Sequence, residues 1–213
     1  KHKKMISMIA NQTSKPLLRS AIFRSSSAIR DGRQSTGTVS TTRRDVSVGT
    51  NLSANECTLQ KARPWHMNDT DSNLATDNAV TMPDLFQGKK VAIFGVPSPF
   101  TGTCTMAHYP PYQKLQDEFL AKGVDEIVCY SVSDPYAHYN WGKVMGNDFD
   151  KISFLADVDG AWARSNELER DYTVASLGHR SARFSMIVED GIVTAFNLVE
   201  DADGDAGWLL EQA

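Results

Sequence analysis

The side chain in this sequence that is most suited to carry out a reaction is the thiol of Cys104. The chain carries three cysteines, at positions 57, 104 and 129, and no two of them have the Cys-x-x-Cys spacing of a zinc site or a dithiol centre. An odd number without such spacing also argues against a disulfide scaffold. We therefore expect a reducing compartment and individual thiol chemistry.

Cys104 lies where a buried strand is predicted to end and a helix to begin. The apolar run of residues 91–96 has strand character and stops at Pro97, and a helix should start near Thr103. A thiol in the first turn of a helix faces unsatisfied N–H groups and the positive end of the macrodipole, both of which favour the thiolate. Thr101, three residues earlier, can direct its hydroxyl at the same space.

The elements that position this loop follow from apolar periodicity and turn residues. The helix after Cys104 should present Tyr112, Leu115 and Phe119 on one face and end at Gly123. Further strands are predicted at 126–132 and 152–156, helices at 135–146, at 161–168 and from about 206, and a hairpin at 183–188 and 192–199, with turns and an irregular hairpin within 46–80. Strands that alternate with helices predict an α/β, thioredoxin-like fold with a mixed central sheet flanked by helices on both faces.

The charge distribution divides the chain into a basic head and an acidic remainder. Residues 1–44 hold ten of the 22 Lys and Arg residues and one acid, whereas residues 45–213 hold 12 bases and 25 of the 26 acids. This acidic balance argues against nucleic-acid binding by the folded part. No apolar run reaches the roughly 18 to 20 residues of a membrane helix, so no membrane partner is expected.

The basic head is also rich in Ser and Thr. Many Arg and Ser residues with few acids are typical of an organelle transit peptide. We therefore expect residues 1–45 to be a disordered transit peptide and residues 46–213 to form one domain. The expected destination is the mitochondrion, with the plastid as an alternative. A basic tail without an address, which would leave the protein cytoplasmic, stays open.

The residues around Cys104 resemble a known family. Pro97, Thr101 and Cys104 match the Pro-x-x-x-Thr-x-x-Cys signature of peroxiredoxins, and the motifs around them are similar to those of the type II, or atypical two-cysteine, subfamily. These motifs are Phe-Gly-Val-Pro at 94–97, Lys-Gly-Val-Asp-Glu-Ile-Val-Cys at 122–129, Ser-Val-Ser-Asp at 131–134, Trp-Gly-Lys at 141–143, Leu-Ala-Asp at 155–157 and Arg-Ser-Ala-Arg-Phe-Ser-Met at 180–186. The resemblance extends from about residue 46 to the C-terminus and implies a thioredoxin-like fold.

The resemblance implies a thiol peroxidase that reduces hydrogen peroxide and alkyl hydroperoxides. Cys104 is then the peroxidatic nucleophile, which becomes a sulfenic acid, and Arg183 is the cation that stabilises its thiolate. Thr101 would hydrogen-bond the peroxide, and Pro97 would shield the pocket from water. No metal, haem, flavin or other cofactor is implied.

The second half of the cycle is left open by the same resemblance. Cys129 stands where plant-like members have a resolving or accessory cysteine, but its predicted strand would bury it, so a core role is weighed equally. The implied reductant is glutathione with glutaredoxin, or thioredoxin. The likeness also implies a homodimer, and Cys57 is expected to be inert.

Two other functions remain for the same fold. A redox sensor or thiol relay would be oxidised at Cys104 and would pass the signal to a partner protein with little turnover. A structural domain would carry a silent thiol instead. Peroxide turnover with a thiol reductant separates these functions from a peroxidase.

Other patterns near the predicted site have simpler interpretations. Cys104 and His108 could share a metal, yet two ligands without partners seldom make a site, so we expect His108 at the surface or at the edge of the pocket. Residues 201–205 are similar to a calcium loop but lack its Gly and Glu spacing, so we expect a solvated acidic turn. Arg180 could replace Arg183, although a surface role is favoured. The aromatic residues nearby, Tyr109, Tyr112 and Trp141, are expected in the core or at an interface.

Overall fold

A computed structural model describes residues 45–65 and 74–213. The transit peptide expected over residues 1–45 therefore lies outside the described residues except for Asp45. None of the helices described is both long enough and apolar enough to span a bilayer.

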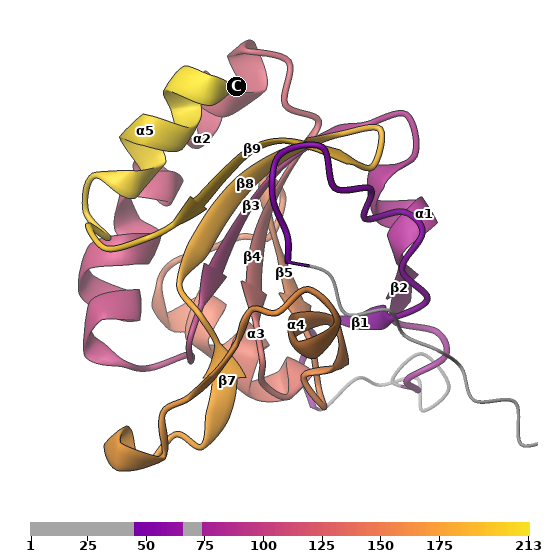
Figure 1. The fold of residues 1–213 in the computed structure, drawn as a ribbon. Coiled ribbons are helices and arrows are strands. Elements are labelled where there is room, and N and C mark those ends of the chain that lie inside the picture. Colours follow the sequence, from indigo (N-terminus) through magenta and orange to yellow (C-terminus); the bar gives the residue numbers. More distant parts are fainter. Residues whose placement is uncertain (1–44, 66–73) are drawn as a thin grey trace, which may run out of the picture. The chain divides into compact units, whose positions relative to one another are not determined.

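The fold is built on one seven-stranded mixed sheet (Figure 1). Its strands are β1 (Thr58–Lys61), β2 (Ala79–Thr81), β3 (Lys90–Val96), β4 (Glu126–Ser131), β5 (Ile152–Ala156), β8 (Phe184–Glu189) and β9 (Ile192–Leu198), in the order β2-β1-β5-β4-β3-β8-β9. Strands β3, β4 and β5 are parallel, and the outer pairs are antiparallel. The predicted thioredoxin-like arrangement is confirmed. A separate two-stranded sheet joins β6 (Glu169–Asp171) to β7 (His179–Ser181).

Helices cover both faces of the large sheet, as predicted. One face carries η2 (Cys104–His108), α2 (Tyr109–Ala121), α3 (Pro135–Val144) and α5 (Asp205–Gln212), and the other carries α1 (Met82–Phe86) and α4 (Ala161–Ser165). We call these the α2 face and the α4 face. Figure 1 shows α2 and α5 together on one side of the sheet and α1 and α4 on the other.

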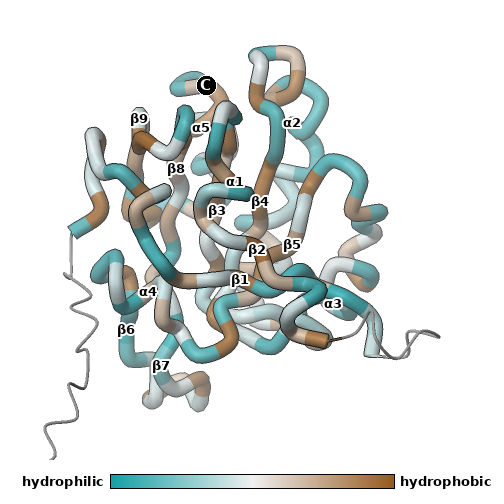
Figure 2. Tube along the Cα trace, turned by 90° about the vertical axis from the view of Figure 1, so that its right-hand side faces the viewer, coloured by the Kyte–Doolittle hydropathy of each residue, from teal (hydrophilic) through white to brown (hydrophobic). Residues whose placement is uncertain are grey.

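The central strands are buried on both faces, because neighbouring residues point to opposite sides of a strand. In β3, Val91 and Ile93 join the core of the α4 face, whereas Ala92 and Phe94 join that of the α2 face. The apolar colouring along β4 and β8 in Figure 2 follows from this double burial. Such near-continuous apolar runs are what made the strands predictable.

The predicted helices begin and end close to their predicted positions. Asp134 caps α3 by accepting hydrogen bonds from the backbone N–H groups of Tyr136 and Ala137, and Pro135 is its first residue. The helix after Cys104 ends at Ala121, near the predicted Gly123, and its opening turn is the π-helix η2. The hairpin of β8 and β9 is confirmed as well. Helix α1 and the pair β6 and β7 were not predicted, because they are short and β6 is made of charged residues.

Candidate active site

The loop from Pro97 to Thr103 joins the end of β3 to η2 and holds its backbone in a fixed shape. Pro97, Ser98 and Pro99 are buried, and Phe100 has a φ of 60°, a left-handed conformation that is rare for an aromatic residue. The hydroxyl of Thr101 donates to the carbonyl of Ser98 at 2.9 Å. Strain of this kind persists only where the surroundings enforce it, so the loop is a rigid support for the helical turn that begins at Cys104.

Cys104 is the first residue of η2 and is 1% exposed. The N–H of Tyr109 bonds to the carbonyl of Cys104, five residues back, which is the π-helical pattern. Single π turns inside α-helices occur often at functional sites. The predicted position of this thiol, just after a buried strand and at the start of a helix, is confirmed.

Arg183 lies beside the Cys104 sulfur although 79 residues separate them in sequence. It immediately precedes β8, the neighbour of β3, so the sheet brings it to the end of β3 where the loop of Cys104 begins. Its Nη2 donates to the Cys104 sulfur at 3.4 Å, and its Nη1 lies 3.0 Å from Nδ1 of His108. The guanidinium is a permanent cation, so it can donate hydrogen bonds to the sulfur, or to an oxygen bound beside it, without losing a proton.

His108 is fully buried, which corrects the expectation that it lies at the surface or at a pocket edge. Its Nε2 lies 2.9 Å from Oδ2 of Asp205, the first residue of α5. The imidazole faces inward, where Phe94 and Tyr112 pack edge-on against its ring. These aromatic neighbours and the carboxylate together explain why a polar side chain is kept out of solvent here.

Asp205 is 2% exposed, which also corrects the expectation of a solvated acidic turn at 201–205. Four side chains surround its carboxylate. Oδ2 accepts from Tyr112 at 2.5 Å and faces His108, while Oδ1 accepts from Ser185 at 2.7 Å and from Asn197 at 3.0 Å. The burial of Asp205 could not be predicted from the acidic composition of this stretch. It depends on hydrogen-bond partners on β8, on β9 and on the helix after Cys104, which are distant in sequence.

Burial and hydrogen bonds set the charges of this pair. Burial raises the pKa of Asp205, but the hydrogen bonds from His108, Tyr112 and Ser185 outweigh it, so that the pKa lies below its usual value. Burial lowers the pKa of His108, and Arg183 lowers it further, although Asp205 opposes both effects. The structure is thus consistent with a charged Asp205 beside a neutral His108.

A pocket of about 490 Å³ opens beside the candidate site. It is lined by Pro97, Arg170, Asp171, Tyr172, Ala182, Arg183, Leu198, Val199 and Glu200. Arg183 lines this pocket and also contacts the Cys104 sulfur, so the pocket lies next to the surroundings of the thiol. Pro97, which the family resemblance implies to be a shield against water, is among the residues that line this pocket.

Arg180, the alternative cation, is engaged elsewhere. Its Nε donates to the carbonyl of Leu177 at 2.8 Å, and its Nη1 donates to the carbonyl of Val132. The bond to Val132 joins β7 to the residue that follows β4. The structure therefore brings Arg183, and not Arg180, to Cys104.

The other two cysteines differ from Cys104. Cys129 is fully buried in β4, its sulfur lies 3.7 Å from Nε2 of His138, and burial raises its pKa well above the ordinary value. Cys57 is half-buried on the α4 face near Ser165, and burial raises its pKa too. Tyr109, Tyr112 and Trp141, named from the sequence as core aromatics, are all fully buried.

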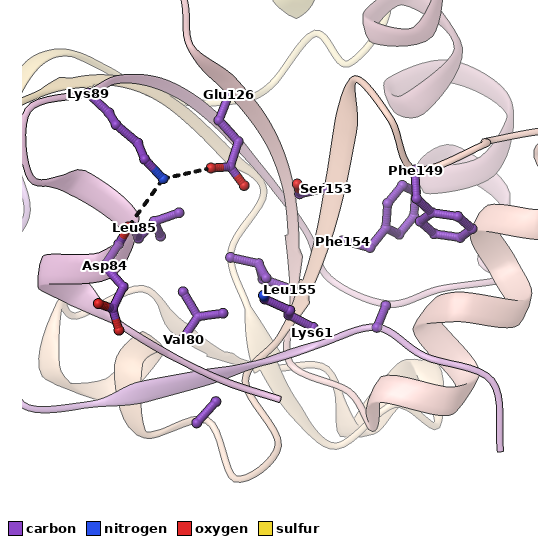
Figure 3. A pocket seen from close by; sticks show the side chains of 12 residues that line it. Lys61, Val80, Asp84, Leu85, Lys89, Glu126, Phe149, Ser153, Phe154 and Leu155 are labelled. Atoms are coloured by element: carbon purple, nitrogen blue, oxygen red, sulfur yellow. Dashed lines mark hydrogen bonds and ion pairs between the residues drawn. The ribbon is translucent and has the colours of Figure 1, made fainter. Parts of the chain in front are cut away.

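A second pocket, of about 370 Å³, lies at the other end of the sheet (Figure 3). Lys89 and Glu126, which pair at 3.4 Å there, stand at the beginnings of β3 and β4. Ligands of parallel sheets bind at the carboxyl ends of strands, where Cys104 lies.

Among the described residues, no group of three or more His, Cys, Asp or Glu side chains could hold a metal ion.

Comparison with known proteins agrees with this geometry. Residues 60–207 match the family model described as Redoxin. The chain is 46% identical over 148 residues to "Peroxiredoxin-2F, mitochondrial" of Oryza sativa subsp. japonica and 44% identical over 148 residues to the protein of the same name in Arabidopsis thaliana, covering 69% of this chain and 71% and 70% of these relatives. Two solved structures are similar: reduced Prx3 of Vibrio vulnificus in complex with hydrogen peroxide (32% identity, TM-score 0.64, 77% of this chain and 96% of that one) and peroxiredoxin 5 of Alvinella pompejana (26%, 0.65, 78% and 98%).

Proposed function

This chain belongs to the redoxin family as a type II peroxiredoxin of the thioredoxin-like superfamily, a thiol-dependent peroxidase, and from that premise we propose that Cys104 is its peroxidatic nucleophile and Arg183 the cation that activates it. The observation that carries the proposal is the contact of 3.4 Å between Nη2 of Arg183 and the Cys104 sulfur. Hydrogen peroxide and alkyl hydroperoxides are the proposed substrates.

The reaction begins when the Cys104 thiolate attacks the terminal oxygen of the peroxide. An S–O bond forms and the O–O bond breaks, so the sulfur loses two electrons and the peroxide gains them. The leaving hydroxide or alkoxide takes a proton from solvent, and Cys104 becomes a sulfenic acid. Arg183 stabilises first the thiolate and then the charge that develops on the leaving oxygen, and it keeps its own protons throughout.

Thr101 and Pro97 have supporting roles in this proposal. The Thr101 hydroxyl gives its proton to the carbonyl of Ser98, so its lone pairs are free to accept the O–H of the peroxide. Pro97 has no N–H and lines the pocket next to Arg183, where it limits the water that reaches the sulfur.

A thiol reductant regenerates the enzyme. We assign the attack on the sulfenic acid to an external thiol, either glutathione with glutaredoxin or thioredoxin, in a cycle with one cysteine. The support is the state of Cys129, whose burial and raised pKa both oppose a reactive thiolate. The external sulfur forms a mixed disulfide and releases water, and a second thiol then frees Cys104.

The proposal also includes the localisation and the assembly of the enzyme. Residues 1–45 serve as a transit peptide and residues 46–213 as the peroxidase domain, in the mitochondrion with the plastid as an alternative. The basic, acid-poor head and the two plant relatives whose names include the word mitochondrial support this assignment. A homodimer is the proposed assembly.

The test is steady-state consumption of hydrogen peroxide by the full chain, with glutathione and glutaredoxin or with thioredoxin. Cys104→Ser should abolish turnover, whereas Cys57→Ser, a matched change at a half-buried cysteine on the other face, should leave it unchanged. Cys129→Ser should retain turnover in a one-cysteine cycle, and its loss would instead make Cys129 the resolving thiol. A folded wild-type protein that is oxidised at Cys104 but turns over with neither reductant would favour a redox sensor.

A further inference from the structure

The buried carboxylate of Asp205 is more fully hydrogen-bonded than packing requires. It accepts from Tyr112, Ser185 and Asn197 and contacts His108, and it stands in the first turn of α5, where the positive end of the helix favours an anion. A buried charge of this kind seldom adds net stability over apolar residues of similar size. Its partners therefore indicate where its effect is felt.

The contacts of Asp205 determine which nitrogen of His108 carries the proton. A charged carboxylate only accepts hydrogen bonds, so Nε2, 2.9 Å from Oδ2, must be the N–H donor. The guanidinium of Arg183 only donates, so Nδ1, 3.0 Å from Nη1, must accept. Both contacts are satisfied together by one neutral tautomer of His108 and by no other protonation state.

This tautomer links Asp205 to the reacting sulfur. Nη1 of Arg183 is held by His108, which leaves Nη2 of the same planar group pointing at Cys104 at 3.4 Å. The guanidinium is flat and its nitrogens have fixed directions, so a donor held at one nitrogen orients the next. A continuous series of contacts thus runs from α5 through His108 and Arg183 to the thiol.

We propose that Asp205 is a positioning residue of the peroxidase: through His108 it holds the Arg183 guanidinium against the Cys104 sulfur, and so helix α5 takes part in the active site. The proposal rests on the proposed roles of Cys104 and Arg183. It requires that Asp205 act on the thiol at a distance, without touching the peroxide.

The test is Asp205→Asn in the full chain, which keeps the size of the side chain and removes its charge. The rate constant for the first reaction with hydrogen peroxide should fall about tenfold. The pH midpoint for alkylation of the Cys104 peptide by iodoacetamide, followed by mass spectrometry, should rise by about one unit, which corresponds to a tenfold smaller thiolate fraction. A variant with lowered stability alone would leave this midpoint unchanged.

Asp157→Asn is the matched control. Asp157 is also an aspartate that is 1% exposed, and it also accepts from a tyrosine hydroxyl, that of Tyr130 at 2.6 Å, but it lies on the α4 face and contacts neither His108 nor Arg183. This variant should lose stability and keep the wild-type midpoint. The proposal is overturned if folded Asp205→Asn keeps both the rate constant and the midpoint, or if Asp157→Asn shifts the midpoint equally.

A second pair of variants decides the matter if Asp205→Asn does not fold. In His108→Gln the amide can donate to Asp205 and accept from Arg183, whereas His108→Leu can do neither. The Gln variant should stay close to the wild-type midpoint and the Leu variant should show the rise; equal midpoints would overturn the proposal. Alkylation needs no peroxide, so it tests Asp205 even if turnover, and with it the proposed function, fails.

Discussion

Within residues 45–65 and 74–213, each face of the central sheet holds one buried aspartate, and the two carboxylates differ in their hydrogen-bond partners. Asp205 on the α2 face has four side-chain partners, and its pKa is lowered. Asp157 on the α4 face accepts from Tyr130 and from the backbone N–H of Ala163, and burial raises its pKa in spite of these bonds. Burial thus opposes the charged form of both carboxylates, and only at Asp205 do the hydrogen bonds, led by those of His108 and Tyr112, outweigh it.

The same contrast extends to the rest of the two faces. Both buried histidines of the described residues, His108 and His138, belong to the α2 face, together with Cys104. On the α4 face the described residues include buried Asp157 but no buried histidine, and large side chains such as Trp162 and Phe184 fill the core. We therefore expect chemistry to depend on one face and stability on both.

The largest effect should come from the arginine of the α2 face. Arg183→Ala removes the donor to Cys104, and loss of one such preorganised donor costs about 10²- to 10³-fold in rate. Arg164→Ala is the matched change on the α4 face, where Arg164 pairs with Glu169 at 3.4 Å, and it should leave the rate unchanged. Stopped-flow measurement of peroxide reduction checks both. Equal losses in the two variants would break the comparison between the faces.

The next largest effect should be a loss of stability on substitution of a glycine that packs against a phenylalanine ring, one glycine on each face. A Cβ at Gly95 would overlap the fully buried ring of Phe184 on the α4 face, and Gly95→Ala should lower the free energy of unfolding by about 3 kcal/mol. At Gly142 on the α2 face the nearest atom, Cζ of Phe149 at 2.8 Å, belongs to a half-buried ring that can shift, so Gly142→Ala should cost only about 1 kcal/mol. Urea unfolding gives both values, and the reverse order would contradict the argument.

Acid should lower the free energy of unfolding through the buried histidines of the α2 face. Burial lowers the pKa of His138 to about 3, so the native state leaves it neutral while the unfolded chain accepts a proton below its ordinary value of 6.5. The free energy of unfolding contributed by His138 is therefore complete above pH 6.5 and falls by about 1.4 kcal/mol per pH unit between 6.5 and 3. His108, whose pKa is also lowered, acts in the same direction.

Urea unfolding at a series of pH values measures this slope, and His138→Gln identifies its source. The variant should be less stable at pH 7, because the contact with Cys129 is lost, yet its stability should fall less steeply with acid. A slope equal to that of the wild type would show that His138 is not the group that titrates.

The smallest effects should be the same on both faces, because helix caps act locally. Asp134→Ala removes the cap of α3 on the α2 face, and Thr81→Ala removes the capping box that Thr81 forms with Asp84 on the α4 face. Each should cost about 1 kcal/mol in thermal unfolding and leave peroxide reduction intact. A loss of activity in Asp134→Ala alone would show that α3 contributes more than support.

Much of the fold could be predicted because its signals are local. The doubly buried strands produce uninterrupted apolar runs, and the turn around Gly191 marks the hairpin of β8 and β9. Helix α1 was not predicted, although Thr81 and Asp84 have the spacing of a capping box in the sequence. The pair β6 and β7 has no such signal, because charged residues such as Arg170 show no alternation.

The candidate site was predictable only in part. Cys104, Thr101 and Pro97 lie within eight residues of one another and match one motif, and the family resemblance supplied Arg183. Asp205 lies 97 residues beyond His108, and an acidic stretch without apolar periodicity gives no hint that one of its members is buried. The sequence does contain a signal for the burial of His108, the partner of Asp205. His108 and Tyr112 are four residues apart and therefore share the buried face of a helix.

The hydrogen bond between Trp141 and Thr105 makes Trp141 an intrinsic fluorescent probe of the helix that carries Cys104. The indole of Trp141 is fully buried and donates from Nε1 to the hydroxyl of Thr105, the residue after Cys104, at 3.1 Å. If η2 opens when Cys104 is oxidised, this bond breaks and water reaches the indole, which changes its emission. Trp162, buried on the α4 face, would keep its surroundings. A change in emission that disappears in Trp141→Phe would thus report the oxidation state of Cys104 in real time, without a label.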